Sequence, residues 1–350
     1  MSKQKPNYKF LFYVTQNYSF AVLRPLQLEI KRQGYEVKWF LTGQQVNYDY
    51  LHDSELQLHT IREVFKYKPD AVFVPGNRMP TFIPGIKVAV FHGFNVSKRP
   101  DEIGHFNIRG CFDLYCTQGP NTTTKFQQLA DKHQFFNVVE TGWPMLDPLF
   151  SKDQKTVVNT NAKKTILFCS TFSKNLTCAP SLLNEIQRLK EKHDWQWIVQ
   201  FHPKMSKTIV DSYKRIHDDK LTFVETDNII PLLQQADIML CDTSSVLLSF
   251  ILQNKPVVTF KNQRPDKHLL NFTNVNELED NLKSAFARPT ELLTEIERFN
   301  AQLHPYQDGK SSARVLSAAI KIINQNPCKK RKPFNLIRLM KTAWKLKFQL

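Results

Sequence analysis

Short runs of apolar residues recur along the chain and alternate with amphipathic segments. Lys9–Thr15 and Tyr35–Thr42 are predicted to be buried strands, and Phe20–Arg32 between them has the spacing of an amphipathic helix. Further strands are predicted at 71–74, 87–91, 114–116 and 138–140. Because strands that alternate with helices build parallel sheets, the pattern predicts a Rossmann-like first domain over residues 1–150.

A second series of the same kind follows a polar, charge-mixed linker at 151–164. Its strands are predicted at 165–170, 197–201, 221–225, 238–241 and 257–260, with a helix from about 180 to 192. Helices at about 276–287, 290–303 and 309–325 come last. We therefore expect an α/β protein with two Rossmann-like domains that face each other across a cleft, residues 1–150 and 165–326, followed by a tail at 327–350.

The unit from Ile238 to Phe260 concentrates the candidate chemistry of the second domain. A strand at 238–241 leads into Asp242, Thr243, Ser244 and Ser245, and a predicted helix from Val246 to Gln253 follows. A helix start at the carboxyl edge of a parallel sheet offers free N–H groups to an anion, so we predict a phosphate site at Thr243–Ser245. The alternative is that these residues only cap the helix.

Two histidines directly follow predicted strands, one in each domain. His92-Gly93 comes after 87–91, and His202-Pro203 comes after 197–201. A histidine at the carboxyl end of a strand can meet a substrate, and its pKa near neutrality suits proton transfer. The alternative is a pair of loop histidines that bond only to backbone. Their equivalent positions, with a predicted phosphate site nearby, favour catalysis.

The net charge of +16 is concentrated at the carboxyl end of the chain. Residues 329–350 hold eight Lys and Arg and no acid, so the rest of the chain is only mildly basic. After Pro333 the apolar residues between Leu336 and Leu350 fall on one broad helical arc and most basic residues on the other. This pattern predicts a helix lying on an anionic membrane surface, and the alternative is a terminal helix packed on the protein core.

Several sequence patterns are absent. There is no GxxxxGK[ST] loop, GxGxxG fingerprint, GxSxG elbow, Asp-x-Asp pair or zinc-spaced His/Cys cluster, so we expect no obligatory metal and no cofactor. The six Cys form no C-x-x-C pair and are expected to be reduced. The apolar run from Phe10 to Val14 is too short for a signal peptide or a membrane span. We therefore expect a cytoplasmic protein, held on the inner face of the cell membrane by its tail.

Five short motifs, taken in order, resemble those of the CDP-glycerol glycerophosphotransferases, the family of the teichoic-acid primases and polymerases. They span about residues 85–315 and are His92-Gly93, Gly142-Trp143-Pro144 with Asp147, Phe201-His202-Pro203, Asp242-Thr243-Ser244-Ser245 and Asp308-Gly309-Lys310-Ser311-Ser312. Four positions depart from the family pattern. Thr243 replaces a tyrosine, Met145 replaces an arginine, and Phe91 and Phe94 stand where tryptophan and threonine flank the His-Gly pair.

This resemblance implies a GT-B fold and transfer of glycerol phosphate, or a related polyol phosphate, from a CDP-activated donor to a glycan or lipid-linked hydroxyl. His92 would take the hydroxyl proton, and His202 with the helix start at Thr243–Ser245 would stabilise charge on the diphosphate. The remaining motif residues would bind donor or line the acceptor side. The donor set is Asp242, Thr243, Ser244, Ser245, Lys310 and Ser311, and the set for the acceptor or the cleft loop is Gly93, Trp143, Pro144 and Asp147. No nucleic-acid partner is implied.

Two other classes of function stay open from the residues. The Asp-Thr-Ser-Ser and Asp-Gly-Lys-Ser-Ser strings also resemble the non-hydrolysing UDP-N-acetylglucosamine epimerases, which share the fold, so a nucleotide-sugar glycosyltransferase or epimerase-like enzyme is one alternative. His92 and His202 favour the transferase over it. A non-enzymatic protein that binds polyanions or a membrane surface is the other, and it explains little beyond the charge of the tail.

Overall fold

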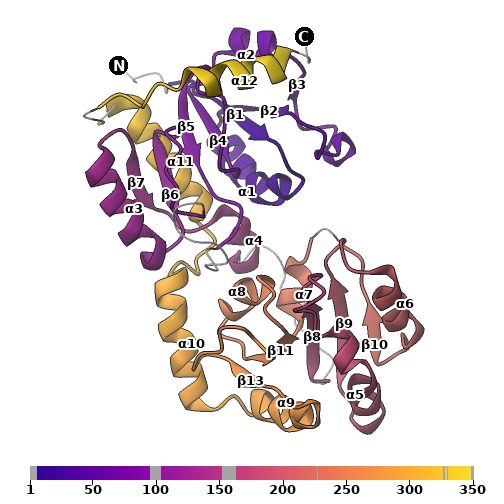
Figure 1. Cartoon of the computed structure of the whole chain (residues 1–350). Helices are drawn as coiled ribbons and strands as arrows, with labels where there is room; N and C mark the ends of the chain where they lie inside the picture. The colour runs from indigo at the N-terminus through magenta and orange to yellow at the C-terminus, as the bar shows by residue number, and fades with distance from the viewer. Residues whose placement is uncertain are drawn as a thin grey trace. The chain divides into compact units, whose positions relative to one another are not determined.

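The computed structural model describes residues 6–94, 104–151, 163–226, 228–325, 328 and 330–347. The chain divides into two compact units. Unit 1 contains Met1–Phe150 together with Leu303–Leu350, and unit 2 contains Ser151–Gln302. Each unit is a parallel sheet flanked by helices (Figure 1).

Unit 1 is built on a seven-stranded sheet in the order β3-β2-β1-β4-β5-β6-β7. Its strands are β1 (Lys9–Val14), β2 (Glu36–Leu41), β3 (Gln57–Leu58), β4 (Ala71–Val74), β5 (Ile86–Ala89), β6 (Leu114–Thr117) and β7 (Asn137–Glu140). Its helices are α1 (Tyr18–Arg32), α2 (Ile61–Tyr67), α3 (Pro120–His133), α4 (Asp147–Phe150), α11 (Ser311–Gln325) and α12 (Leu336–Lys347). Short 3₁₀ turns lie at Tyr48–Tyr50 and Pro144–Leu146.

Unit 2 is built on a six-stranded sheet in the order β10-β9-β8-β11-β12-β13. Its strands are β8 (Thr165–Ser170), β9 (Gln196–Phe201), β10 (Leu221–Phe223), β11 (Ile238–Cys241), β12 (Val257–Phe260) and β13 (Leu270–Phe272). The helices are α5 (Ala179–Lys192), α6 (Lys207–Arg215), α7 (Ile230–Gln235), α8 (Val246–Ile251), α9 (Leu278–Ala287) and α10 (Thr290–Leu303), with a 3₁₀ turn at Val275–Glu277.

The central strands are continuous apolar runs because helices cover both faces of each sheet. In β1 every residue after Lys9 is buried, and in unit 1 Phe12 packs edge-on against Trp39 of β2 with ring centroids 4.9 Å apart. In unit 2 all six residues of β8 and all four of β11 are buried. The predicted parallel sheets are therefore confirmed, while the two-residue strand β3 and the three-residue strand β13 escaped prediction because neither carries a periodic pattern.

Strand order places one switch point in each sheet. In unit 1 the chain moves outward from β1 to β3 and then crosses to β4 on the other side of β1. In unit 2 it moves from β8 to β10 and then crosses to β11 on the other side of β8. Ligands of open α/β sheets bind at such points, outside the carboxyl ends of the strands. The loops after β1 and β4, and those after β8 and β11, are therefore where a site is expected.

The grouping of α11 differs from the predicted boundary at 326. Residues 303–325 belong to unit 1, because α11 packs against α1, β5 and β6 through a buried face. That face contains Val315, Leu316, Ala319 and Ile322. Lys310 and Ser311 therefore lie in a different unit from Asp242–Ser245. Over the described residues, none of the helices has the length and apolarity needed to cross a membrane.

Candidate active site

His92 lies in the loop after β5 of unit 1. Its Nδ1 is 3.1 Å from the carbonyl oxygen of Pro75, which follows β4, and its ring stacks on Tyr18 at the start of α1 with centroids 4.9 Å apart. A carbonyl oxygen can only accept a hydrogen bond, so Nδ1 carries the proton and Nε2 of the neutral ring has a free lone pair. The side chain keeps an exposed edge, yet surrounding protein lowers the pKa of His92 below its ordinary 6.5 by desolvation.

Two buried side chains hold the backbone on either side of His92. Phe91 has a φ of 57°, a left-handed conformation that costs a bulky residue about 1–3 kcal/mol. The indole Nε1 of Trp143 donates to the carbonyl oxygen of Phe91 at 3.3 Å, and Nε2 of Gln118 donates to that of Gly93 at 3.0 Å. Trp143 is only 4% exposed, so its place in the predicted acceptor or cleft loop is an internal one.

Trp143 is in turn fixed by His304, which no sequence motif indicated. The backbone N–H of Trp143 donates to Nε2 of His304 at 2.9 Å. His304 is fully buried, and burial lowers its pKa to about 4, so the ring is neutral with its proton on Nδ1. Gly142 approaches so closely that a Cβ there would lie 2.9 Å from the same Nε2 and 2.5 Å from the Ser311 hydroxyl, which leaves room for glycine alone.

Asp147 caps helix α11 from inside the fold. Its carboxylate oxygens accept the backbone N–H groups of Ser311 at 2.8 Å and Ser312 at 2.7 Å, and Pro144 in the preceding turn is also buried. An internal carboxylate thus satisfies two of the donors that a helix start leaves free. The backbone N–H of Ser311 is therefore already used, and the contact of its side chain with the donor stays a prediction. Lys310 stays exposed.

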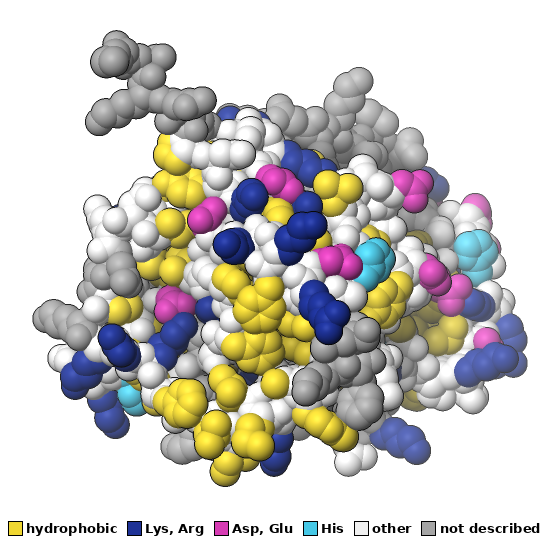
Figure 2. Space-filling model, turned by 90° about the horizontal axis from the view of Figure 1, so that it is seen from above, with side chains coloured by type: hydrophobic (Ala, Val, Ile, Leu, Met, Phe, Trp, Pro, Cys, Tyr) yellow, Lys and Arg dark blue, Asp and Glu magenta, His cyan; other side chains and the backbone are white. Residues whose placement is uncertain are grey.

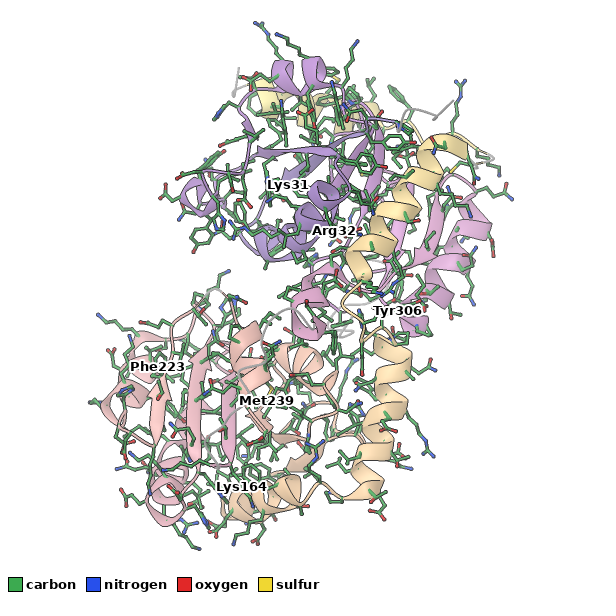
Figure 3. All side chains as sticks on the ribbon, turned by 180° about the vertical axis from the view of Figure 1, so that it is seen from behind. Lys31, Arg32, Lys164, Phe223, Met239 and Tyr306 are labelled. Atoms are coloured by element: carbon green, nitrogen blue, oxygen red, sulfur yellow. The ribbon has the colours of Figure 1, made fainter. Side chains whose placement is uncertain are left out.

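Arg314 joins the Asp-Gly-Lys-Ser-Ser motif to the Gly-Trp-Pro motif. It forms a bidentate pair with Asp308 at 2.8 and 2.9 Å and donates to the carbonyl oxygen of Thr141 at 2.8 Å. Its guanidinium also lies 4.0 Å from the ring centre of Tyr306, which Figure 3 marks in the segment before α11. Arg314 lowers the pKa of Asp308 to about 2. These contacts keep the two motifs together within unit 1.

His202 follows β9 in unit 2 and is exposed. Its Nδ1 accepts the backbone N–H of Lys204 at 3.0 Å, and its ring lies 4.6 Å from that of Phe172, which is 42% exposed. Because the partner is an N–H donor, Nδ1 has no proton and the neutral ring carries its hydrogen on Nε2. Burial and then the charge of Lys204 lower the pKa of His202. His202 thus offers a donor where His92 offers an acceptor.

Asp242 is a structural residue at the switch point of unit 2. Its side chain is fully buried and accepts the Ser170 hydroxyl at 2.6 Å and the N–H groups of Thr171 and Cys178 at 3.1 Å. It therefore ties the loop after β8 to the end of β11. This corrects the prediction of direct donor contact, because a saturated, buried carboxylate is closed to an anionic ligand.

Thr243, Ser244 and Ser245 form the turn between β11 and α8. Figure 3 labels Met239, which lies in β11. Ser245 occupies the N-cap position of α8 but makes no side-chain capping hydrogen bond, and Thr243 accepts the backbone N–H of Gln263 at 3.2 Å. Ser245 is exposed and Ser244 is partly exposed. Side-chain capping of α8 therefore does not explain the Ser245 hydroxyl, and both serines have exposed surface.

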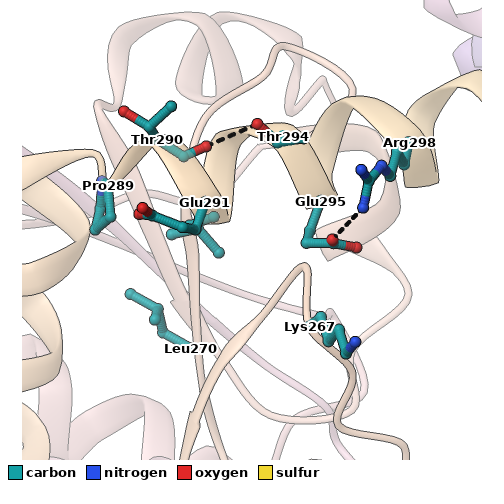
Figure 4. Close-up of a pocket in the computed structure, with 9 residues that line it drawn as sticks. Lys267, Leu270, Pro289, Thr290, Glu291, Thr294, Glu295 and Arg298 are labelled. Carbon is teal, nitrogen blue, oxygen red and sulfur yellow. Dashed lines mark hydrogen bonds and ion pairs between the residues drawn. The ribbon is translucent and has the colours of Figure 1, made fainter.

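A surface depression elsewhere in unit 2 does not fit a phosphorylated ligand. It is lined by the start of β13 and the first turns of α10, including Leu270, Glu291 and Glu295 (Figure 4). It therefore lies at the amino end of β13, whereas ligands bind at the carboxyl ends of parallel strands. Its one arginine, Arg298, is already paired with Glu295 at 2.6 Å.

Among the described residues, no group of three or more His, Cys, Asp and Glu could hold a metal ion.

The sequence analysis did not identify four residues that lie near His92 or His202 or support the loops that carry them. Tyr18 and Phe172 are aromatic residues just after β1 and β8, so their positions beside the switch points carried a usable signal. Gln118 and His304 carried none, because they act on Gly93 and Trp143 from 25 and 161 residues away.

Residues 109–267 match the sequence profile of a family described as CDP-glycerol:poly(glycerophosphate) glycerophosphotransferase. The teichoic acid glycerol-phosphate primase of Bacillus subtilis (strain 168) is 28% identical over 128 residues, which are 35% of this chain and 33% of the primase. The chain therefore spans about one third of the length of this curated relative.

Two solved structures share the fold across most of the chain. The wall teichoic acid polymerase TagF matches with a TM-score of 0.67 at 15% identity, over 91% of this chain and 90% of the other. A putative UDP-N-acetylglucosamine 2-epimerase from Listeria monocytogenes matches with a TM-score of 0.65 at 16% identity, over 95% and 100%. At such identities the likeness shows the fold alone, and it confirms the predicted pair of Rossmann-like domains of GT-B type. The matched profile covers less than half of the chain, and together with the related primase it shows that this chain is similar to the CDP-glycerol glycerophosphotransferase family.

Proposed function

We propose that the protein transfers glycerol phosphate, or a related polyol phosphate, from a CDP-activated donor to a hydroxyl of a cell-surface glycan or lipid-linked acceptor. The observation that carries this proposal is that Nδ1 donates a hydrogen bond in His92 and accepts one in His202. His92 gives its Nδ1 proton to a carbonyl and His202 receives an N–H at the same atom. One ring is therefore prepared to accept a proton at Nε2 and the other to donate a hydrogen bond there.

The reaction needs those two capacities. The acceptor hydroxyl attacks the phosphorus that bears the polyol, a new P–O bond forms, and the P–O bond to CMP breaks. Nε2 of His92 takes the hydroxyl proton, as a general base does. Nε2–H of His202 donates to the diphosphate and stabilises the charge that develops on the leaving CMP.

The donor diphosphate binds the turn after β11 in this proposal. Ser244 and Ser245 carry hydroxyls without a capping partner, and they follow a strand at the switch point of unit 2. The loop after β9, which carries His202, belongs to the same carboxyl edge of that sheet, with β8 between the two strands. No obligatory metal is proposed, because the hydroxyls and His202 supply the charge stabilisation that magnesium often provides.

The acceptor side includes an anionic membrane surface on the inner face of the cell membrane, bound by α12. Leu346 is buried in the core of unit 1, and Lys332 pairs with Asp113 at 2.8 Å. Four apolar residues of α12 point outward instead: Leu336, Ile337, Met340 and Trp344, each more than half exposed. Figure 2 looks onto this end of the chain and shows hydrophobic side chains gathered among lysines and arginines. Such a surface suits an anionic leaflet.

Ligand-induced thermal stabilisation tests the donor class. CDP-glycerol, CDP-ribitol, UDP-N-acetylglucosamine and CMP would be compared with the purified chain, and turnover would be followed as CMP release with a lipid-linked or glycan acceptor. We expect stabilisation by a CDP-polyol and by CMP, and acceptor-dependent CMP release. Stabilisation by the UDP-sugar alone would replace the transferase with the epimerase-like alternative.

A further inference from the structure

We propose that Trp143 and His304 are positioning residues for His92: they hold the strained His-Gly loop so that Nδ1 meets Pro75 and Nε2 faces outward. This inference rests on the proposed role of His92 as the base. It assigns a purpose to the Gly-Trp-Pro motif that differs from ligand contact.

The loop 91–94 is held at each of its four residues. The Phe91 carbonyl accepts from the Trp143 indole at 3.3 Å, and the His92 ring bonds Pro75 at 3.1 Å. The Gly93 carbonyl accepts from Gln118 at 3.0 Å. The fourth residue, Phe94, packs edge-on against the Trp143 ring with centroids 5.3 Å apart. Two of the four contacts therefore lead to Trp143.

The contact at Phe91 decides the direction of the His92 side chain. Phe91 has a φ of 57°, and its side chain is fixed in the core, where it stacks on His105 at 4.8 Å between centroids. With the side chain fixed and φ in the left-handed region, its carbonyl is turned toward Trp143. Without that donor the buried carbonyl loses its partner, and the peptide before His92 is released toward an ordinary conformation.

Trp143 has this position because His304 accepts its backbone N–H. Both residues are buried, the N–H to Nε2 distance is 2.9 Å, and Gly142 leaves no space for another arrangement. His304 comes from the segment before α11, so the link joins residues far apart in sequence to the loop that carries His92. A neutral ring is required, because Nε2 must keep its lone pair to accept.

The test compares Trp143→Phe, which removes the indole N–H together with part of the ring, with Trp197→Phe in unit 2, which removes the same atoms. Trp197 is a matched control, because its buried Nε1 has no hydrogen-bond partner within the described part of the chain. The first readout is the ¹⁵N chemical shift pair of the neutral His92 ring, assigned by loss of the signal in His92→Ala, which reports the tautomer. The second is the kcat and the donor KM of the transfer reaction.

We expect Trp143→Phe to shift His92 from the Nδ1–H tautomer toward a mixture and to lower kcat by about tenfold to a hundredfold, with donor KM little changed. Trp197→Phe should leave both readouts as in the parent. A Trp143→Phe variant with the parental tautomer and a kcat within about twofold of the parent would overturn the proposal. If the parent itself transfers nothing, the proposed function fails, and the tautomer comparison still decides the positioning role.

A second pair keeps the test decisive if Trp143→Phe does not fold. His304→Gln keeps an acceptor where Nε2 lies, whereas His304→Met fills the site without one. We expect His304→Met to reproduce the tautomer shift and the loss of kcat, and His304→Gln to restore most of both. Equal behaviour of the two variants, with both folded, would show that His304 only fills space.

Discussion

Nδ1 of His92 lies 3.1 Å from the carbonyl oxygen of Pro75, and this contact sets which nitrogen of the ring is free. At His202 the same atom, Nδ1, accepts the backbone N–H of Lys204 at 3.0 Å, so the proton of the neutral ring lies on Nε2 instead of Nδ1. Two histidines that each follow a parallel strand therefore differ in what they can do. The difference makes them distinguishable by substitution.

Glutamine separates the two roles. A glutamine amide can donate a hydrogen bond but cannot take a proton at neutral pH. We expect His202→Gln to keep part of the activity that His202→Ala loses. His92→Gln should be as inactive as His92→Ala, with a loss of about 10²–10⁴-fold in kcat. Initial rates of CMP release check both pairs, and donor affinity should be nearly unchanged in both His92 variants.

His59→Ala is the control for these substitutions, since His59 is an exposed histidine of unit 1 outside the loops that carry the candidate site. Recovery of activity in His92→Gln would remove His92 from the role of base. Equal loss in the two His202 variants would argue for proton transfer by His202 in place of hydrogen bonding.

The sequence predicted where the candidate residues lie better than it predicted what their side chains bond to, for a physical reason. Parallel strands end at one edge, so the order of strands and turns was enough to predict that His92 and His202 follow strands of two sheets. Asp242 and Asp147 also stand at strand ends or in turns, but both carboxylates are consumed by backbone N–H groups inside the fold. Sequence spacing cannot distinguish a carboxylate that contacts a ligand from one that accepts the backbone N–H groups of the fold itself.

The pH dependence of stability should reveal His304. Burial lowers the pKa of His304 to about 4, below its ordinary 6.5 in the unfolded chain. The unfolded state therefore binds the proton first, so the stability that this residue contributes is present above pH 6.5 and is lost as the pH falls toward 4. The difference is at most about 3 kcal/mol. Urea unfolding between pH 4 and pH 7.5 checks it.

The comparison for that experiment is His304→Gln, which keeps the acceptor for Trp143 but cannot be protonated. Its unfolding free energy should fall less steeply than that of the parent between pH 6.5 and 4. Parallel curves would mean that His304 is protonated in the folded state as readily as in the unfolded chain.

Ser244→Ala and Ser245→Ala should weaken nucleotide binding more than folding. A lost N-cap ordinarily costs about 1 kcal/mol, but Ser245 makes no capping hydrogen bond that could be lost. Thr60→Ala is the matched control, because the Thr60 side chain does accept the N–H of Glu63 at the start of α2. It should lower the melting temperature and leave CDP-donor affinity unchanged. If calorimetry shows unchanged nucleotide affinity in the serine variants while their melting temperatures fall, the hydroxyls act as helix caps.

Transfer should survive chelation. The proposed charge stabilisation comes from His202 and the two serine hydroxyls, so EDTA should leave the initial rate of CMP release within about twofold. Complete loss of activity, restored by magnesium, would show that a metal ion carries the charge instead.

The exposed face of α12 should bind anionic membranes. Deleting the tail outright would also remove Leu346 from the core of unit 1, so point changes on the outer face are the cleaner test. Ile337 and Trp344 are 69% and 64% exposed, and replacing both by Gln removes apolar area that would enter the headgroup region. We expect the double variant to melt as the parent does.

Sedimentation with phosphatidylglycerol-containing liposomes should show weaker binding of this variant, and activity on membrane-borne acceptors should fall while a soluble acceptor analogue is still used. Leu28→Gln is the control, because Leu28 is 68% exposed on α1 and lies outside the tail. Adding salt should weaken binding of the parent, since each basic residue near an anionic leaflet contributes about 1 kcal/mol of screened attraction. Undiminished liposome binding by the folded double variant would leave α12 without a membrane role.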